Sequence, residues 1–347
     1  PYSEPVIFFN DIRRTDKQQG VFGELSIDTS ETSELTVGAR WYDIEVDFEG
    51  SANSSFGNGF GNSDQQRFGS NLSTQYAPNN ANGYPDKAQT DGVIGKVTYS
   101  WNPSEDIMYY VTWSEGFRPG LLNRPVGRST ADGSYTVKPA VDSDEVVNFE
   151  FGWKTLLADG RLRFNGSAFM VDVTGLQTTI FDPSIVNLFF SDNAADAEIT
   201  GLEGDFMYYP DMDGWILSGA FSFLDTEITK KLVPTNDVIV GTELAFAPGF
   251  QGNVSARKEW GMSSGNTGHF QAQLTVSDDS VSDVMEPNKA PQDSYSMMNI
   301  RAGVSNDAWL AEVYIDNVTD ERAEIANTFV FDRQRVGIVR PTTVGVR

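Results

Sequence analysis

This chain contains few of the residue types that usually carry out catalysis or bind metals. Its 347 residues include no Cys and a single His, His269. The lack of Cys excludes disulfides, thiol catalysis, iron–sulfur clusters and Cys-ligated zinc. His269 falls at an expected turn and has no Ser or Asp at the spacing of a catalytic set. We therefore expect no enzymatic activity and no bound cofactor.

Two groups of carboxylates are candidates for binding Ca²⁺, which takes several oxygen ligands. Neither group has the spacing of an EF-hand loop, so we favour solvated loop charge over a calcium site. The groups are Asp182, Asp192, Asp196 and Glu198, and Asp278, Asp279, Asp283 and Glu286.

The stretch of residues 50–91 is rich in Asn, Ser, Gly and Gln, with aromatic residues between them. Such a mixture suits a pocket for a sugar or a siderophore, and it equally suits a loop with local packing. The candidate ligand contacts in this stretch are Phe56, Phe60 and Tyr76.

A second candidate contact region follows a periodic segment that ends near Arg118, which lies between two glycines. A guanidinium can form two parallel hydrogen bonds with a carboxylate or a phosphate. The alternative, which we favour, is that this region fixes a loop to the end of a strand. The candidate residues are Phe117, Arg118, Asn123 and Arg124.

The net charge of the chain limits the kinds of molecule that it can bind. The chain has 25 Lys and Arg against 49 Asp and Glu, a formal net charge of −24. A nucleic-acid-binding protein needs a basic face, so nucleic acid is excluded as a partner. The aromatic content of 12% argues against disorder. No apolar run approaches the roughly 18 residues that a membrane-spanning helix requires.

The elements that must position these side chains are strands. In residues 145–154, for example, Phe149, Phe151 and Trp153 alternate with Glu150 and Lys154. We expect about thirteen such segments of ~9–12 residues, the length of a strand that crosses a bilayer at a tilt. They begin near Gln19, Leu35, Val93, Ile107, Val146, Leu162, Leu202, Trp215, Gly252, Phe270, Tyr295, Trp309 and Thr342.

The connections between these segments alternate in length. Short ones, such as Ala158–Gly160, alternate with long ones, of which Phe48–Asp91 and Phe117–Asp144 are the largest. A membrane β-barrel has short periplasmic turns and long outer loops, whereas a soluble sandwich has no reason for this order. We therefore expect an all-β, antiparallel transmembrane barrel.

The polar face of each strand would line the inside of that barrel. Charges there could contact a solute or a domain in the lumen, or they could pair with one another across strands, which we favour for any single residue. The candidate inner residues are Glu150, Lys154, Arg161, Arg163, Glu203, Asp205, Glu312 and Asp316.

Four stretches resemble motifs of the TonB-dependent outer-membrane receptors. Residues 110–120 resemble "Y-x-x-x-S-x-G-F-R-x-G", and residues 145–154 resemble "E-x-x-x-x-E-x-G-x-K". Residues 201–203 resemble the "G-x-E" strand start, and residues 317–320 resemble "N-L-x-D". Together they cover roughly residues 90–347 in order. Pro341-Thr342 departs from the Pro-Arg that the family usually has.

The resemblance implies a barrel of about 22 strands with a plug in its lumen. Because single-chain bacterial barrels close with an even number of strands, we expect residues 1–347 to be the C-terminal part of that barrel, without the plug. The implied function is uptake of a scarce large solute, such as an iron siderophore, a corrinoid or an oligosaccharide. Loops would capture the solute and TonB–ExbB–ExbD would act on the plug, in an outer membrane of lipid and lipopolysaccharide.

Two other functions stay open at this point. One is a passive porin, which would lack a plug and carry an inward-folded constriction loop. The other is a soluble β-sandwich that binds glycans.

Overall fold

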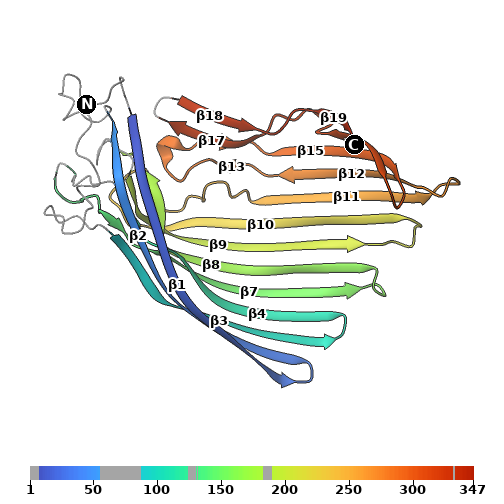
Figure 1. Ribbon diagram of the computed structural model, residues 1–347, viewed down its shortest axis with the longest axis horizontal. Coiled ribbons are helices and arrows are strands. Elements are labelled where there is room, and N and C mark those ends of the chain that lie inside the picture. The colour runs from blue at the N-terminus through green and yellow to red at the C-terminus, as the bar shows by residue number, and fades with distance from the viewer. Residues whose placement is uncertain (1–7, 55–86, 124–129, 131, 183–189, 331–332) are drawn as a thin grey trace.

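The computed structural model describes residues 8–54, 87–123, 130, 132–182, 190–330 and 333–347. In this part the chain forms one curved 13-stranded sheet, in which each strand pairs antiparallel with its neighbours in chain order (Figure 1). Each of the thirteen expected segments corresponds to one of these strands, which confirms the predicted all-β fold. No helix within these ranges is long and apolar enough to cross a membrane.

The strands of the large sheet are β1 (Phe8–Ser30), β2 (Ser33–Ser54), β3 (Lys87–Ser104), β4 (Ile107–Arg118), β7 (Asp144–Leu157), β8 (Leu162–Ile180), β9 (Phe190–Tyr208), β10 (Trp215–Lys231), β11 (Phe250–Gly261), β12 (Thr267–Ser277), β15 (Tyr295–Ser305), β16 (Leu310–Asp316) and β19 (Thr343–Val346). Three small hairpins lie in the connections: β5 (Leu121–Leu122) with β6 (Ala140–Val141), β13 (Ser280–Val281) with β14 (Pro291–Gln292), and β17 (Glu324–Val330) with β18 (Arg333–Ile338). A single 3₁₀ turn, η1 (Glu286–Asn288), precedes β14.

The two ends of the sheet differ, as the alternation of connection lengths predicts. Short turns join the strands at one end, at residues 31–32, 105–106, 158–161, 209–214, 262–266 and 306–309. The long connections, as far as the structure describes them, lie at the other end, on the left in Figure 1.

Several strands are longer than the expected ~9–12 residues. β1 has 23 residues and β2 has 22. Their extra length lies at the long-connection end, where polar pairs such as Lys17 Nζ to Glu45 Oε1 (3.0 Å) follow the ladder. The expectation was too short because it counted only residues with an apolar face. The backbone ladder needs no such face and continues beyond it.

The convex face of the sheet carries an apolar band. The register aligns Tyr99, Val111, Phe151, Leu202 and Phe223 across the strands, with Ala168 between Phe151 and Leu202. Each of these five large side chains is exposed. Such a continuous exposed apolar surface is unfavourable in water and is what the lipid-facing side of a barrel requires.

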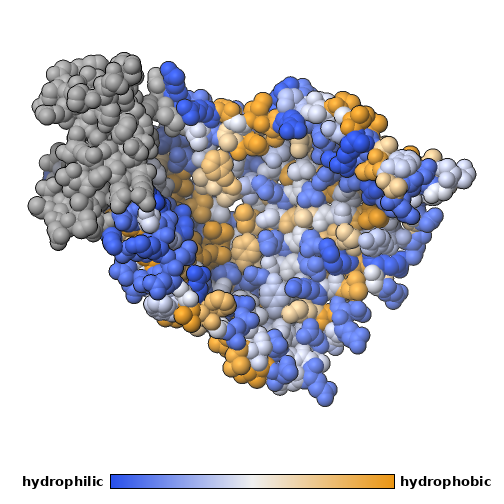
Figure 2. Space-filling model, viewed as in Figure 1, coloured by the Kyte–Doolittle hydropathy of each residue, from blue (hydrophilic) through white to orange (hydrophobic). Residues whose placement is uncertain are grey.

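The concave face is polar in its middle and apolar toward the long connections. Figure 2 looks onto this face, where hydrophilic residues spread over the centre and hydrophobic ones gather near the long connections. Two buried clusters account for the apolar part. One contains Tyr42, Ile44, Val46, Ala88 and Leu122. The other contains Val137, Ile180, Phe190, Ala194, Ala195, Ile228, Val233, Val238 and Met285. The buried core of the described chain therefore lies under the connections and not between two sheets.

Aromatic rings cover glycines on neighbouring strands. Gly152 lies opposite Tyr110 in the register, and a Cβ added to Gly152 would overlap the Tyr110 ring. Gly166 has the same relation to Trp153, and Gly201 to Phe169. Each ring covers backbone that the missing side chain leaves open, as in designed sheets where aromatic residues rescue glycines.

Replacing Gly152 by Ala should destabilise the sheet, because the Tyr110 ring must move to make room for the methyl group. Overpacking of this kind costs about 1–3 kcal/mol. The free energy of unfolding in detergent, measured by urea titration, checks this. Gly261→Ala is the matched control, because nothing lies within 4 Å of the added Cβ. Equal stability of the two variants would show that the ring is not packed on Gly152.

Candidate functional site

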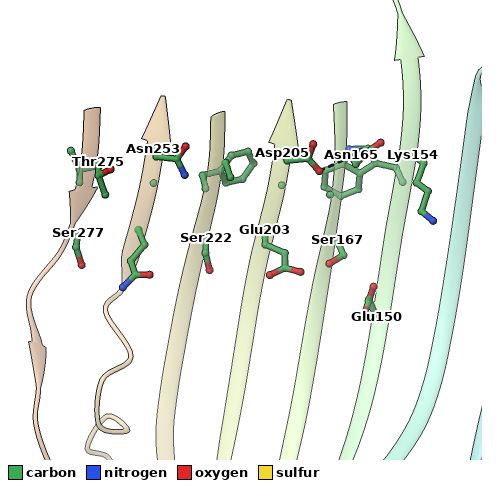
Figure 3. A pocket seen from close by; sticks show the side chains of 18 of the residues that line it. Glu150, Lys154, Asn165, Ser167, Glu203, Asp205, Ser222, Asn253, Thr275 and Ser277 are labelled. Atoms are coloured by element: carbon green, nitrogen blue, oxygen red, sulfur yellow. Dashed lines mark hydrogen bonds between the residues drawn. The ribbon is translucent and has the colours of Figure 1, made fainter. Parts of the chain in front are cut away.

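A hollow of about 580 Å³ lies in the middle of the concave face (Figure 3). Two transverse rows of mostly small and mostly polar side chains line it, and each residue is the register partner of the next. The first row is Ser167, Glu203, Ser222, Gln251 and Ser277. The second is Lys154, Asn165, Asp205, Ala220, Asn253 and Thr275. Because most of these side chains are small, the wall is recessed where the rows run.

The hollow is acidic, with the carboxylates of Glu150, Glu203 and Asp205 against the single ammonium of Lys154. Glu150 Oε1 accepts a hydrogen bond from the Tyr110 hydroxyl at 2.5 Å. Asp205 Oδ2 lies 3.0 Å from Arg163 Nη2. Within the described ranges, neither Glu203 nor Lys154 forms a side-chain hydrogen bond or an ion pair, so both remain available to a ligand or partner.

The structure brings half of the predicted inner residues together here: Glu150, Lys154, Glu203 and Asp205 line the hollow. The other four lie elsewhere. Arg163 pairs with Asp205 just beyond it, and Asp316 Oδ1 lies 3.3 Å from Arg301 Nη2. Arg161 belongs to the turn at residues 158–161, where it pairs with Asp211 and not with another strand.

The expectation for His269 is wrong in position, because the turn ends at residue 266 and His269 is the third residue of β12. Its side chain is buried and crosses Gly303, placing Nε2 2.9 Å from Glu312 Oε2. Arg347 Nη2 lies 3.0 Å from Glu312 Oε1. The predicted inner residue Glu312, on β16, therefore contacts β12 and the residue that follows β19, near the short-turn end.

The connection between β4 and β7 folds against the concave face. Its β5–β6 hairpin packs on residues of β2 and β3, where the amide of Gly120 donates to Thr90 Oγ1 at 2.9 Å. Asn123 is buried and donates from Nδ2 to the carbonyls of Lys138 (2.8 Å) and Ser191 (2.6 Å). Asn123 is thus a structural bridge between the connection and β9.

Arg118 and Phe117 hold the start of this connection. Asp144 is 1% exposed and accepts hydrogen bonds from the backbone amide of Arg118 (3.0 Å), from Arg118 Nε (2.7 Å) and from the backbone amide of Gln177 (3.2 Å). Phe117 stacks on Tyr42 with 3.8 Å between ring centroids. These contacts match the loop-fixing alternative. Asp144 and Gln177 were not predicted as contacts of Arg118. The available signal was that Asp144 is the first residue of β7, the strand that pairs with the end of β4 at Arg118.

Four predicted ligand contacts, Phe56, Phe60, Tyr76 and Arg124, lie outside the described residues.

Three carboxylates of the first group considered for Ca²⁺ are engaged separately. Asp182 accepts from the Thr235 hydroxyl at 2.8 Å, and Asp196 accepts from the Gly175 amide at 2.8 Å. Asp192 accepts from the Tyr135 hydroxyl. Burial, together with Asp192, raises the pKa of Tyr135, so this phenol stays protonated and donates. Over the residues that the structure describes, no three acidic or His side chains converge to hold a metal ion.

Comparison with known proteins gives a family. The model of the family described as "TonB dependent receptor-like, beta-barrel" matches residues 1–318. The chain is also 25% identical over 157 residues to the probable TonB-dependent siderophore receptor PiuA of Acinetobacter baumannii, a match that covers 44% of this chain and 20% of that protein.

Solved structures show the same fold. The ferric yersiniabactin uptake receptor FyuA from Yersinia pestis superposes with a TM-score of 0.71 at 16% identity, over 96% of this chain and 45% of that one. The copper transporter OprC gives a TM-score of 0.68 at 14% identity, over 95% of this chain and 47% of that one. The chain spans less than half the length of these relatives.

Replacing Arg118 by Ala should loosen the connection between β4 and β7, because it leaves the buried Asp144 charge without its guanidinium. The Arg118 side chain is 56% exposed and Asp144 keeps two backbone amide donors, so the loss costs about 1–3 kcal/mol, the range for leaving a buried acceptor with too few donors. Chymotrypsin should then cleave between residues 119 and 143 at least tenfold faster. Arg163→Ala is the matched control, since its partner Asp205 is half-exposed and such pairs contribute below about 1 kcal/mol. Equal cleavage of both variants would show that the Asp144 contact does not hold the connection.

Proposed function

Because the chain belongs to the TonB-dependent receptor family, we propose that it forms wall and outer loops of an active transporter for a scarce solute too large for porins. Its location is the outer membrane of a Gram-negative bacterium, where this family resides. Members of the family are transporters and receptors, so the expected chemistry is binding and gating and not covalent catalysis.

The observation that carries this proposal is the contrast between the two faces of the sheet. The convex face exposes an apolar band, whereas the concave face is lined by Ser, Asn, Gln, Thr and carboxylates around the hollow. A wall with this inner lining requires water, a polar solute or a polar domain inside. The long connections, which face outward in such barrels, have their own buried clusters and can therefore hold a shaped capture surface.

The proposed mechanism has two stages. The outer connections first capture the solute at the cell surface. A plug inside the barrel, coupled to TonB–ExbB–ExbD, then opens a path along the polar wall. The polar wall supports the second stage because a hydrophilic solute that moves along it exchanges water for side-chain hydrogen bonds at little cost.

We propose that the solute is a metal chelate, with an iron siderophore as the first candidate. Support comes from the relatives, which are a siderophore receptor, a ferric yersiniabactin receptor and a copper transporter. A corrinoid or an oligosaccharide is the next candidate, because both also need a polar wall with hydrogen-bonding side chains.

A passive porin is the second candidate function, and one observation favours it. The connection between β4 and β7 packs on the concave face, as the constriction loop of a porin does. The soluble sandwich is not supported, because the large strands form one sheet and not two packed sheets.

Uptake of ferric chelates by intact cells tests the proposal. Hydroxamate, catecholate and citrate chelates of radioactive iron would be offered to the wild type, to a strain lacking this gene and to a strain lacking TonB. We expect at least one chelate to lose uptake in both mutants and to regain it in the first when the full gene is restored. Uptake that depends on this gene but not on TonB would identify a passive channel. Uptake that is unchanged for every chelate would overturn the assignment of iron chelates.

A further inference from the structure

A second hollow of about 170 Å³ adjoins the first at the long-connection end. It lies among the connections at residues 232–249 and 278–294 and the start of β17. Gln251, Ser277 and Tyr295 line both hollows, so the two are continuous. We call the combined feature the acidic trough. It runs from the outer connections to the middle of the concave face.

The outer mouth of the trough is apolar, whereas its floor is polar and negative. Phe246 and Ile325 line the mouth and are 50% and 51% exposed. Six carboxylates line the trough against one cation, Lys154, at its far end: Glu150, Glu203, Asp205, Asp278, Asp293 and Glu324.

Three of these carboxylates lack a partner among the residues that the structure describes. Asp205 pairs with Arg163, Glu150 accepts from Tyr110, and Glu324 accepts from Asn327 at 3.2 Å. For Glu203, Asp278 and Asp293, the described chain offers the carboxylate no hydrogen bond and no ion pair. Uncompensated charges along one recess focus the field there and attract a cation.

Glu203 also stands between two hydroxyls, because Ser167 and Ser222 are its register partners on either side (Figure 3). Ser167 is 5% exposed and lines the hollow, and its hydroxyl forms no hydrogen bond with the residues that the structure describes. The little surface that Ser167 exposes lies in the hollow, so its hydroxyl is available there to a ligand or to water. Its position next to an unpaired carboxylate therefore points to a ligand.

The geometry of this group fits a protonated amine. An ammonium has three N–H donors and no acceptor, and one carboxylate between two hydroxyls offers it three acceptors. The Tyr110 ring covers Gly152, which is the register partner of Ser167, so an aromatic face lies beside the same position. Cations are attracted to such a face.

We propose that Glu203, Ser167 and Ser222 bind a protonated amine carried by the transported solute, which enters through the mouth at Phe246 and Ile325. The proposal rests on the proposed function and narrows its substrate to solutes with a cationic amine. The solute is the occupant, and not a lysine of a domain inside the barrel, because the trough continues to an opening among the outer connections. A binding site for a side chain of the domain inside the barrel would need no such opening.

The absence of Cys from the 347 residues makes a direct test possible, because one introduced Cys is the only thiol of this part of the protein. Ser222→Cys in the full receptor, purified in detergent, would be reacted with a cationic and an anionic methanethiosulfonate of similar size. We expect the cationic reagent to react at least tenfold faster. Adding Glu203→Gln should reduce this preference several-fold, because it removes the charge and keeps the shape.

Ser218→Cys is the matched control site. Ser218 lies four residues earlier on β10, on the same face and outside the trough. Four residues of strand span about 13 Å, which exceeds the screening length of about 8 Å at physiological salt. The charge preference at Ser218→Cys should therefore not depend on Glu203.

Protection by a small amine tests the ligand itself. Millimolar 1,5-diaminopentane should slow modification of Ser222→Cys, uncharged 1,5-pentanediol should not, and Glu203→Gln should abolish the protection. Equal reaction with both reagents, or equal protection by diamine and diol, would overturn the proposal. The proposal would also be overturned if Ser222→Cys reacted only after the internal domain is removed. That result would show that a side chain of this domain occupies the proposed amine site. No transport is measured, so the outcome is independent of the uptake test.

Discussion

The rest of the structure depends on one constraint: in a membrane, every backbone N–H and C=O must find its partner within the protein. An antiparallel ladder of thirteen strands meets it for the eleven strands that lie between the edge strands β1 and β19. Once the ladder is fixed, the period of two residues assigns each side chain to lipid or to the interior. The same strand register therefore places the apolar side chains on the convex face and the side chains of the acidic hollow on the concave face. A shift by one residue would exchange them.

This constraint also explains where the molecule keeps its buried core. A sheet with lipid on one side and a polar interior on the other has no need for apolar packing between layers. The buried apolar residues gather instead beneath the long connections, where Val46 and Leu122 meet in one cluster and Ile228 and Met285 in the other. The connections are thus folded elements in their own right. Buried polar bridges such as Asn123 and Asp144 tie them to the strands.

The sequence predicted what is periodic or local. Alternation predicted each of the thirteen strands, and the content of Gly, Asn and Asp predicted the short turns. Pairings between distant residues could not be predicted. Tyr110 and Glu150 are separated by 40 residues, and Asn123 and Ser191 by 68. His269 shows that the exact ends of strands are also hard to predict. A shift of one or two residues decides whether His269 belongs to a turn or to β12, and only its place in β12 brings it to Glu312. The acidic trough also depends on registers across many strands, so its four predicted residues could be placed on the inner face but not joined into one recess.

The order of the strands has a consequence for how the wall assembles. Each large strand pairs with the strand before it in the chain, so no pairing has to wait for a distant segment. The short turns close loops of only a few residues, for which the entropy lost on closure is small. Such a meander has low contact order for its size, which favours rapid formation. Each completed hairpin presents a free edge that templates the next. The sheet can therefore form by adding one strand after another at its edge. The rate of assembly is then set by how fast each successive hairpin forms.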